Sequence, residues 1–308
     1  MGLCRAANRL TPVAVILLLA GCDTRSPDPF WDVYDVPIAG GGLGLWADSP
    51  NEVWVASGGV FRIHDGVVIP QTDVDSLVPV GERPNAIWGT GPKDVRVNGA
   101  IHFNGTTWQA GTEWGHSLWA ADPNHYLLVN ARGIYHFDGA YWTYQDLSKG
   151  ILSQARTFSR VHGVSRTRAV LVGRESLAFE LNGYQLTDLR PPSCMNYRDA
   201  WVDAASAYVV GQTCPPSTST SRVLRYHQGS WEDLAFPDPS DGLQLNFVTM
   251  CDERLVVGGQ DPYTGRGSVW VRQAGRWDML YEAPVGALFC VSNRLITSNG
   301  GEIWIERE

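Results

Sequence analysis

The sequence is poor in basic residues, and lysine is almost absent. It has 24 Lys and Arg residues against 32 Asp and Glu residues, a formal net charge of −8, and its lysines are Lys93 and Lys149. A protein that binds nucleic acid or anionic lipid through phosphate contacts needs a positive surface. The acidic balance argues against both as the main partner, and we expect no nucleic-acid partner.

A long apolar run is also missing. The N-terminal run Val13–Ala20 is too short to span a bilayer as a helix. It follows Arg5 and Arg9 and ends in Leu-Ala-Gly-Cys at Cys22, which resembles a bacterial lipobox. Residues 1–21 are therefore predicted to be a lipoprotein signal peptide. An ordinary secretory signal followed by a chance cysteine is the alternative.

Lipidation of Cys22 would make the lipid bilayer the first partner of the protein. Several acyl chains on one residue anchor stably, because each buried CH2 contributes about 0.8 kcal/mol. We expect an exported protein, lipid-anchored to a bacterial membrane on the periplasmic side or at the cell surface. Without residues 1–21 the chain has 22 basic and 32 acidic residues, a net charge of −10.

Motifs of catalysis and metal binding are lacking too. There is no Gly-rich phosphate loop and no Gly-x-Ser-x-Gly elbow. The segment 72–76, TDVDS, lacks the Gly and the distal Glu of a calcium loop, and His116 and His125 have no matching ligand partner. We predict no catalytic residue, no metal site and no cofactor. A glycosidase pair of acids that meets only in three dimensions stays open.

What the sequence does contain is a repeat of about forty residues. Each unit has about four short strands rich in β-branched and aromatic residues, separated by Gly, Pro, Asn and Asp, which is the spacing of propeller blades. Outside the signal, no segment has a convincing helical period. The seven units begin at Leu45, Ile87, Leu118, Val161, Ala200, Val248 and Leu288.

The seventh unit ends after its third strand. The stretch FWDVYDVP, which begins at Phe30, resembles RWDMLYEAP, which begins at Arg276. We predict that residues 31–36 form the outer strand of the last blade and close the ring, which removes a free sheet edge. A loose linker is the alternative. The predicted fold is all-β: a seven-bladed β-propeller of four-stranded antiparallel blades over residues 30–308, preceded by a tether at 22–29.

These repeats resemble those of bacterial β-propeller lipoproteins with a Trp…Asp-Val-Trp…His-x-Asp-Gly-x-x-Trp pattern. They are also broadly similar to kelch and WD40 propellers. The most kelch-like unit has Gly258 and Gly259 before a loop and Trp277 at its end. The resemblance implies the fold and says little about function, since propellers host many activities.

The stretch YHFDGAYW, residues 135–142, shows how we interpret the repeated motifs. Asp138-Gly139 aligns with Asp65-Gly66 and similar pairs, which predicts two-residue hairpin turns with positive φ at both positions. His136 is replaced by Glu or Arg in other units, so we interpret it as a packing residue and not as a catalyst.

The tryptophans form two recurring sets. Recurrence inside strands favours packing between blades, although a lectin with a sugar site in each blade would also repeat its aromatic residues. The predicted inner-strand set is Trp46, Trp88, Trp119 and Trp201, and the outer-strand set is Trp31, Trp108, Trp142, Trp231 and Trp277.

The connections between blades and between second and third strands are longer than the other turns. They share one face of a propeller, which we call the long-loop face, and function collects on loops held by a rigid scaffold. The residues predicted to contribute exposed contacts there are Arg83, Trp114, Tyr197, Arg198 and Tyr263.

Four cysteines follow Cys22, and an even number in an exported protein permits two disulfides. Cys194 and Cys214 fall in two long loops of the same face, so we predict that they pair. Cys251 and Cys290 end the first strands of neighbouring units. Whether these two strands come close enough for a bridge stays open.

The predicted function is a membrane-anchored extracytoplasmic lipoprotein that serves as a binding or scaffold module for protein partners in the cell envelope. A lectin-type propeller for envelope polysaccharide is one alternative. A glycosidase or lyase with acids clustered at the propeller axis is the other.

Overall fold

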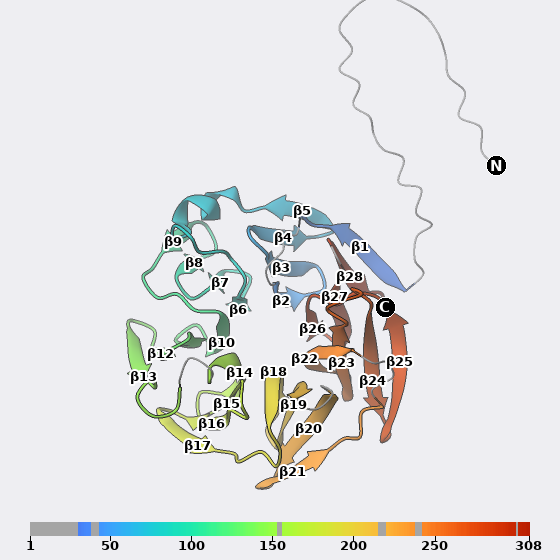
Figure 1. The fold of residues 1–308 in the computed structure, drawn as a ribbon. Coiled ribbons are helices and arrows are strands. Elements are labelled where there is room, and N and C mark those ends of the chain that lie inside the picture. Colours follow the sequence, from blue (N-terminus) through green and yellow to red (C-terminus); the bar gives the residue numbers. More distant parts are fainter. Residues whose placement is uncertain (1–29, 38–42, 153–155, 215–219, 238–241, 300) are drawn as a thin grey trace, which may run out of the picture.

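The computed structural model describes residues 30–37, 43–152, 156–214, 220–237, 242–299 and 301–308. The predicted signal peptide, Cys22 and the tether lie outside the described residues. Seven four-stranded antiparallel sheets form a ring, with the first strand of each sheet at the centre and the fourth at the periphery (Figure 1). The predicted seven-bladed β-propeller is confirmed. Within the described ranges, no helix is long and apolar enough to cross a membrane.

The first three blades follow the chain in order. Blade 1 contains β2 (Gly44–Ser49), β3 (Glu52–Ala56), β4 (Val60–His64) and β5 (Val67–Pro70), and is followed by the 3-10 helix η1 (Thr72–Leu77). Blade 2 contains β6 (Ile87–Gly91), β7 (Asp94–Val97), β8 (Ile101–Phe103) and β9 (Trp108–Ala110). Blade 3 contains β10 (Ser117–Asp122), β11 (His125–Val129), β12 (Gly133–Phe137) and β13 (Trp142–Asp146).

The next three blades have longer inner strands. Blade 4 contains β14 (Phe158–Ser165), β15 (Arg168–Gly173), β16 (Ala178–Asn182) and β17 (Gln185–Asp188). Blade 5 contains β18 (Met195–Val202), β19 (Ser206–Thr213), β20 (Ser221–His227) and β21 (Ser230–Asp233). Blade 6 contains β22 (Gln244–Cys251), β23 (Arg254–Gln260), β24 (Gly267–Gln273) and β25 (Arg276–Glu282).

Blade 7 joins the two ends of the described chain. Its inner three strands are β26 (Leu288–Val291), β27 (Arg294–Asn299) and β28 (Glu302–Glu306), and its outer strand is β1 (Trp31–Asp35). β1 pairs antiparallel with β28 from Trp31 opposite Glu306 to Asp35 opposite Glu302 (Figure 1). The predicted closure of the ring by the N-terminal strand is therefore confirmed.

The hydrophobic core lies between neighbouring blades. One buried cluster joins Leu127 of blade 3 to Leu171 of blade 4, and another joins Val210 of blade 5 to Val257 of blade 6. Each sheet buries both faces against its neighbours, so apolar residues on both faces of the inner strands are protected from water.

The outer-strand tryptophans pack against the preceding blade, as predicted. The Nε1 of Trp231 donates to the backbone oxygen of Leu189 at 2.8 Å, and the Nε1 of Trp277 donates to that of Leu234 at 3.0 Å. Both oxygens follow the outer strand of the blade before. Trp142 instead lies under the Arg96 guanidinium, 5.7 Å from the ring centroid. All three rings are half-buried.

The Gly hairpins are of two kinds. Asp65-Gly66 has φ of 47° and 80°, as predicted for a two-residue turn. At Asp138-Gly139 only the glycine has positive φ, so that prediction is wrong for the aspartate. The Asp138 carboxylate instead accepts the N–H groups of Ala140 and Tyr141 at 2.9 and 2.8 Å, which closes a longer loop and lowers its pKa. His136 is buried beside Tyr184 of the next blade, as expected of a packing residue.

Candidate functional site

The seven inner strands present one equivalent position around the propeller axis. Strand pairing places these residues in register: Trp46 is opposite Trp54, His162 opposite Val170 and Phe289 opposite Ile296. We call this set the aromatic layer, since six of its seven members carry rings. Its members are Trp46, Trp88, Trp119, His162, Trp201, Thr249 and Phe289.

Two tryptophans of this layer turn away from the axis. A Cβ at Gly89 would lie 2.6 Å from the Trp46 ring, and one at Gly163 would lie 2.7 Å from the Trp119 ring. Each glycine belongs to the next blade and leaves room for the indole to lie against its backbone. Trp46 and Trp119 are consequently buried between blades, 5% and 3% exposed.

The other four rings of the layer meet across the channel. The Trp88 ring lies 5.9 Å from Phe289 and 5.8 Å from His162, and His162 stacks on Trp201 at 6.0 Å between centroids. Because Trp88 contacts residues of blades 7 and 4, these rings form a floor across the axis. Trp88 and Trp201 were expected to pack between blades. Both pack in part against clusters between blades, and both also line the channel as part of this floor.

A second layer lies two residues earlier in the chain, on or directly before each inner strand, and nearer the long-loop face. We call it the rim layer, and its members are Gly44, Ala86, Ser117, Arg160, Asp199, Phe247 and Ala287. The residues from blades 7, 1, 2 and 3 are small. Those from blades 4, 5 and 6 are large or charged, and the pairing of each of their strands is irregular at this point.

The three irregularities share one cause. Each strand has an extra residue before its rim residue, a β-bulge. A glycine of the second strand faces each bulge, and a Cβ there would meet the backbone oxygen of the inner strand at 2.1 Å for Gly173, 2.2 Å for Gly211 and 1.9 Å for Gly259. The absent side chains therefore permit the bulges that turn Arg160, Asp199 and Phe247 toward the axis.

Arg160 and Asp199 form an ion pair that joins three blades. The Nε of Arg160 donates to Oδ1 of Asp199 at 2.7 Å, and Oδ1 also accepts the N–H of Ala200. Oδ2 accepts the N–H of Val248 from blade 6 at 3.0 Å. Burial raises the pKa of Asp199, and the positive charge of Arg160 opposes this shift.

His162 is held as a neutral ring. Its surroundings withhold water, and together with the charge of Arg160 they lower the pKa of His162 to about 3. The Nδ1 accepts the N–H of Val202 at 3.1 Å. The proton of the neutral imidazole is therefore on Nε2.

The two layers enclose a cavity of about 210 Å3 on the propeller axis. Its polar side is formed by Arg160, Asp199, His162 and Thr249. Its opposite wall is apolar and is formed by the small rim residues of blades 7, 1 and 2 together with Leu43, Leu45, Ile87 and Leu288. Asp199 is the one carboxylate that lines it among the described residues. Within the same ranges no three His, Cys, Asp or Glu side chains are grouped as metal ligands. The pair of axial acids required by a glycosidase does not occur in this lining.

The five residues predicted for the long-loop face differ in exposure. Tyr263 is 92% exposed and Arg83 is also exposed, whereas Trp114 and Arg198 are half-buried. The prediction is wrong for Tyr197, which is fully buried and stacks on Trp231. The bulge extends β18 to Met195, so that Tyr197 lies in a strand and faces the inter-blade core.

Tyr263 stands on a rigid turn between β23 and β24. The Asp261 carboxylate accepts the N–H of Tyr263 and the hydroxyl of Thr264, both at 2.8 Å, and the backbone oxygen of Asp261 accepts the N–H of Gly265. The N–H of Tyr263 and the hydroxyl of Thr264 lower the pKa of the Asp261 carboxylate. The three bonds together fix the turn while leaving the phenol ring exposed.

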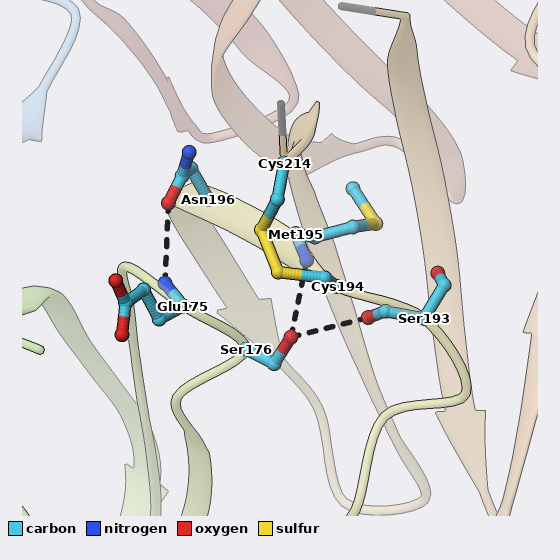
Figure 2. Close-up of a disulfide and its surroundings, with 7 residues drawn as sticks. All are labelled: Glu175, Ser176, Ser193, Cys194, Met195, Asn196 and Cys214. Atoms are coloured by element: carbon cyan, nitrogen blue, oxygen red, sulfur yellow. Dashed lines mark hydrogen bonds between the residues drawn. A yellow bond between two sulfur atoms is a disulfide. The ribbon is translucent and has the colours of Figure 1, made fainter. Parts of the chain in front are cut away.

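Both disulfides permitted by the sequence are present. Cys194 and Cys214 are bridged with 5.4 Å between Cα atoms, as predicted. The hydroxyl of Ser176 accepts the N–H of Met195 and donates to the backbone oxygen of Ser193, so blade 4 is tied to the start of blade 5 beside the bridge (Figure 2). In the chain-entropy model a loop of this size contributes about 3 kcal/mol.

The second disulfide joins Cys251 and Cys290, the pair for which the sequence did not settle whether the strands come close enough. Cys251 and Cys290 are bridged, also with 5.4 Å between Cα atoms, because inner strands of neighbouring blades converge near the axis. Cys290 lines the axial cavity. The bridge joins blade 6 to blade 7, the blade that closes the ring.

Sequence reasoning missed the axial cavity. A signal was present in the sequence two positions before the aromatic layer. When the seven units are aligned there, four of the residues are small and two are charged. Glycine at the end of the second strand in units four to six was a further signal, since it marks a close backbone approach.

Comparisons with known proteins support the architecture. No protein-family model matches the chain, and no curated protein does. Among solved structures, the extracellular domain of a one component system from B. thetaiotaomicron is similar at 12% identity and a TM-score of 0.66, over 91% of this chain and 40% of that chain. The GH74 xyloglucanase from Xanthomonas campestris is similar at 16% identity and a TM-score of 0.62, over 89% of this chain and 53% of that chain.

A third neighbour is matched over nearly its whole length. The Pan2 WD40 domain from Neurospora crassa is similar at 9% identity and a TM-score of 0.63, over 90% of this chain and 95% of that chain. This chain spans 40% and 53% of the first two neighbours. At these identities the likeness shows the fold alone, and that fold is a seven-bladed β-propeller.

Proposed function

We propose that this protein is a membrane-anchored extracytoplasmic lipoprotein whose propeller binds a protein partner through the long-loop face. The observation that carries the proposal is Tyr263, an aromatic side chain that is 92% exposed on a turn fixed by Asp261. Tyrosine is enriched at protein interfaces, and a side chain on a rigid turn loses little entropy on binding. Val80 and Arg83 are exposed on a second long loop.

The extracytoplasmic location has separate support. Two disulfides are typical of proteins that fold in an oxidising compartment. Two structural neighbours are described as extracellular domains of sensor systems. Anchoring through Cys22 is tested by labelling cells with an alkyne-tagged palmitate. We expect label on the wild type and none on Cys22→Ala, with the variant released from membranes. Equal labelling of both would contradict the anchor.

The sequence left a polysaccharide partner as the second candidate. The outer-strand tryptophans that would supply its stacking platforms are buried or half-buried, and three of them donate their N–H groups to the preceding blade. A protein partner is therefore the function that the surface supports best.

The test uses two exposed tyrosines on opposite faces. A photo-crosslinking amino acid replaces Tyr263 in one variant and Tyr141 in another, and cells are irradiated intact. Tyr141 is 75% exposed in the hairpin between β12 and β13, on the face of tight turns. We expect a discrete protein adduct from position 263 and none from position 141. Adducts from both positions alike, or from neither, would contradict a partner on the long-loop face.

A further inference from the structure

The axial cavity has the size of a single ring. Its volume is about 210 Å3, whereas an engineered apolar cavity of about 150 Å3 binds benzene and larger ligand pockets begin near about 300 Å3. The floor is formed by the rings of Trp88, His162, Trp201 and Phe289. The planes of His162 and Trp201 differ by 28°, whereas Trp88 lies edge-on to His162 at 81° and to Phe289 at 74°. A flat ring of similar size would therefore meet both faces and edges of aromatic rings, which are favourable contacts.

The polar groups around this floor are mainly donors. The Nε2–H of His162 and the indole N–H groups of Trp88 and Trp201 have no acceptor within the described part of the chain. The Nε of Arg160 is occupied by Asp199, and its two Nη groups have no acceptor in the same part of the chain. Asp199 already accepts three hydrogen bonds. A bound molecule therefore has to bring acceptors.

The net charge of the lining favours a neutral molecule. Arg160 is balanced by Asp199 at 2.7 Å, and the ring of His162 is neutral. A carboxylate placed at the Nη groups would also feel the repulsion of Asp199. A sugar is a poorer match, because each of its hydroxyl hydrogens needs an acceptor and the lining offers few.

We propose that the axial cavity is a binding site for a small, neutral aromatic compound with a carbonyl oxygen, which stacks on the aromatic layer and accepts hydrogen bonds from Arg160. The site is separate from the partner surface around Tyr263. Loss of the crosslink at position 263 therefore has no bearing on it.

The first test compares three probes by saturation-transfer NMR and calorimetry on the purified propeller. We expect benzamide to bind with a Kd of about 1 mM or below, benzoate to bind more weakly, and methyl glucoside not to bind. No benzamide binding at about 10 mM, or tighter binding of the glucoside, would overturn the proposal.

The second test places the probe in the cavity. Arg160→Lys keeps a cation beside Asp199 but removes the guanidinium fork, and we expect about tenfold weaker benzamide binding. Arg166→Lys, in an exposed ion pair with Asp122 on the tight-turn face, is the control and should bind like the wild type. Thr249→Phe adds a seventh ring to the layer, which fills part of the cavity and should abolish benzamide binding. This variant tests the site independently if Arg160→Lys does not fold. Wild-type affinity in folded Thr249→Phe would place the probe elsewhere and overturn the site.

Discussion

The two sides of the channel differ although the blades repeat. The inner strands of blades 4, 5 and 6 have eight residues each and a bulge beside the rim residue, whereas those of blades 7, 1 and 2 have four to six residues. The register shifts of blades 1 and 2 lie instead at the tight-turn end of the strand. The bulged side carries Arg160, Asp199 and Phe247, and the other side carries small residues. One extra residue per strand, permitted by a facing glycine, thus turns a near-symmetric ring into a one-sided cavity.

Removing the carboxylate at the centre of the bulged side should have the largest effect. Asp199→Ala leaves the half-buried Arg160 guanidinium and the buried N–H of Val248 without their acceptor. We expect the free energy of unfolding to fall by about 3–5 kcal/mol, measured by urea denaturation.

An exposed pair provides the control for that loss. Asp122→Ala breaks the ion pair with Arg166, whose side chain is 58% exposed, and should cost about 1 kcal/mol or less. Equal losses in the two variants would mean that the Arg160–Asp199 pair stabilises no more than a surface ion pair.

Substitution of a glycine opposite a bulge should cause the next largest loss of stability. In Gly211→Ala the new Cβ would lie 2.2 Å from the backbone oxygen of Asn196, so β18 must shift. We expect a loss of about 2–3 kcal/mol on thermal or urea unfolding. Gly91→Ala is the matched control because its Cβ would meet nothing within 4 Å and its φ is not positive. A Gly211→Ala protein with wild-type stability and unchanged benzamide binding would show that the glycine facing the bulge is not needed to form the cavity.

The pH dependence of His162 has a definite sign. Its pKa is about 3 in the folded protein against 6.5 as a free side chain, so below pH 6.5 the unfolded state takes up a proton that the folded state refuses. The contribution of His162 to stability is therefore present above pH 6.5 and lost as the pH falls toward 3. His162→Gln keeps an acceptor for the N–H of Val202 but has no group that titrates. The difference in free energy of unfolding between the wild type and this variant should shift against the wild type as the pH falls from 7 to 4. A constant difference would contradict the lowered pKa.

Much of the fold could be predicted because it depends on local patterns. Strands, Gly turns and the recurring tryptophans follow from alternation and spacing within each unit, and the likeness of residues 30–37 to the last strand of blade 6 predicted the closure at Trp31. The pairing of Cys194 with Cys214 followed from placing both on one face.

The site depended on details that alternation does not report. The bulge at Arg198 shifts the register of β18, so Tyr197 is buried where a loop residue was expected. Trp46 and Trp88 occupy equivalent positions, yet the Trp46 ring is buried between blades and the Trp88 ring lines the channel. The next blade offers Gly89 to the Trp46 ring, whereas Ala120 occupies the equivalent position beside Trp88. The placement of these side chains depends on residues of the neighbouring blade, so the sequence pattern within one unit does not predict it.

A crystal structure of the protein soaked with benzamide would show directly whether the axial cavity binds a ring. We expect density for one flat ring on the axis, stacked on the aromatic layer, with its carbonyl oxygen within hydrogen-bond distance of the Arg160 Nη groups. Density only at the surface, or an axial space filled by rearranged Trp88 and Phe289 side chains, would contradict it.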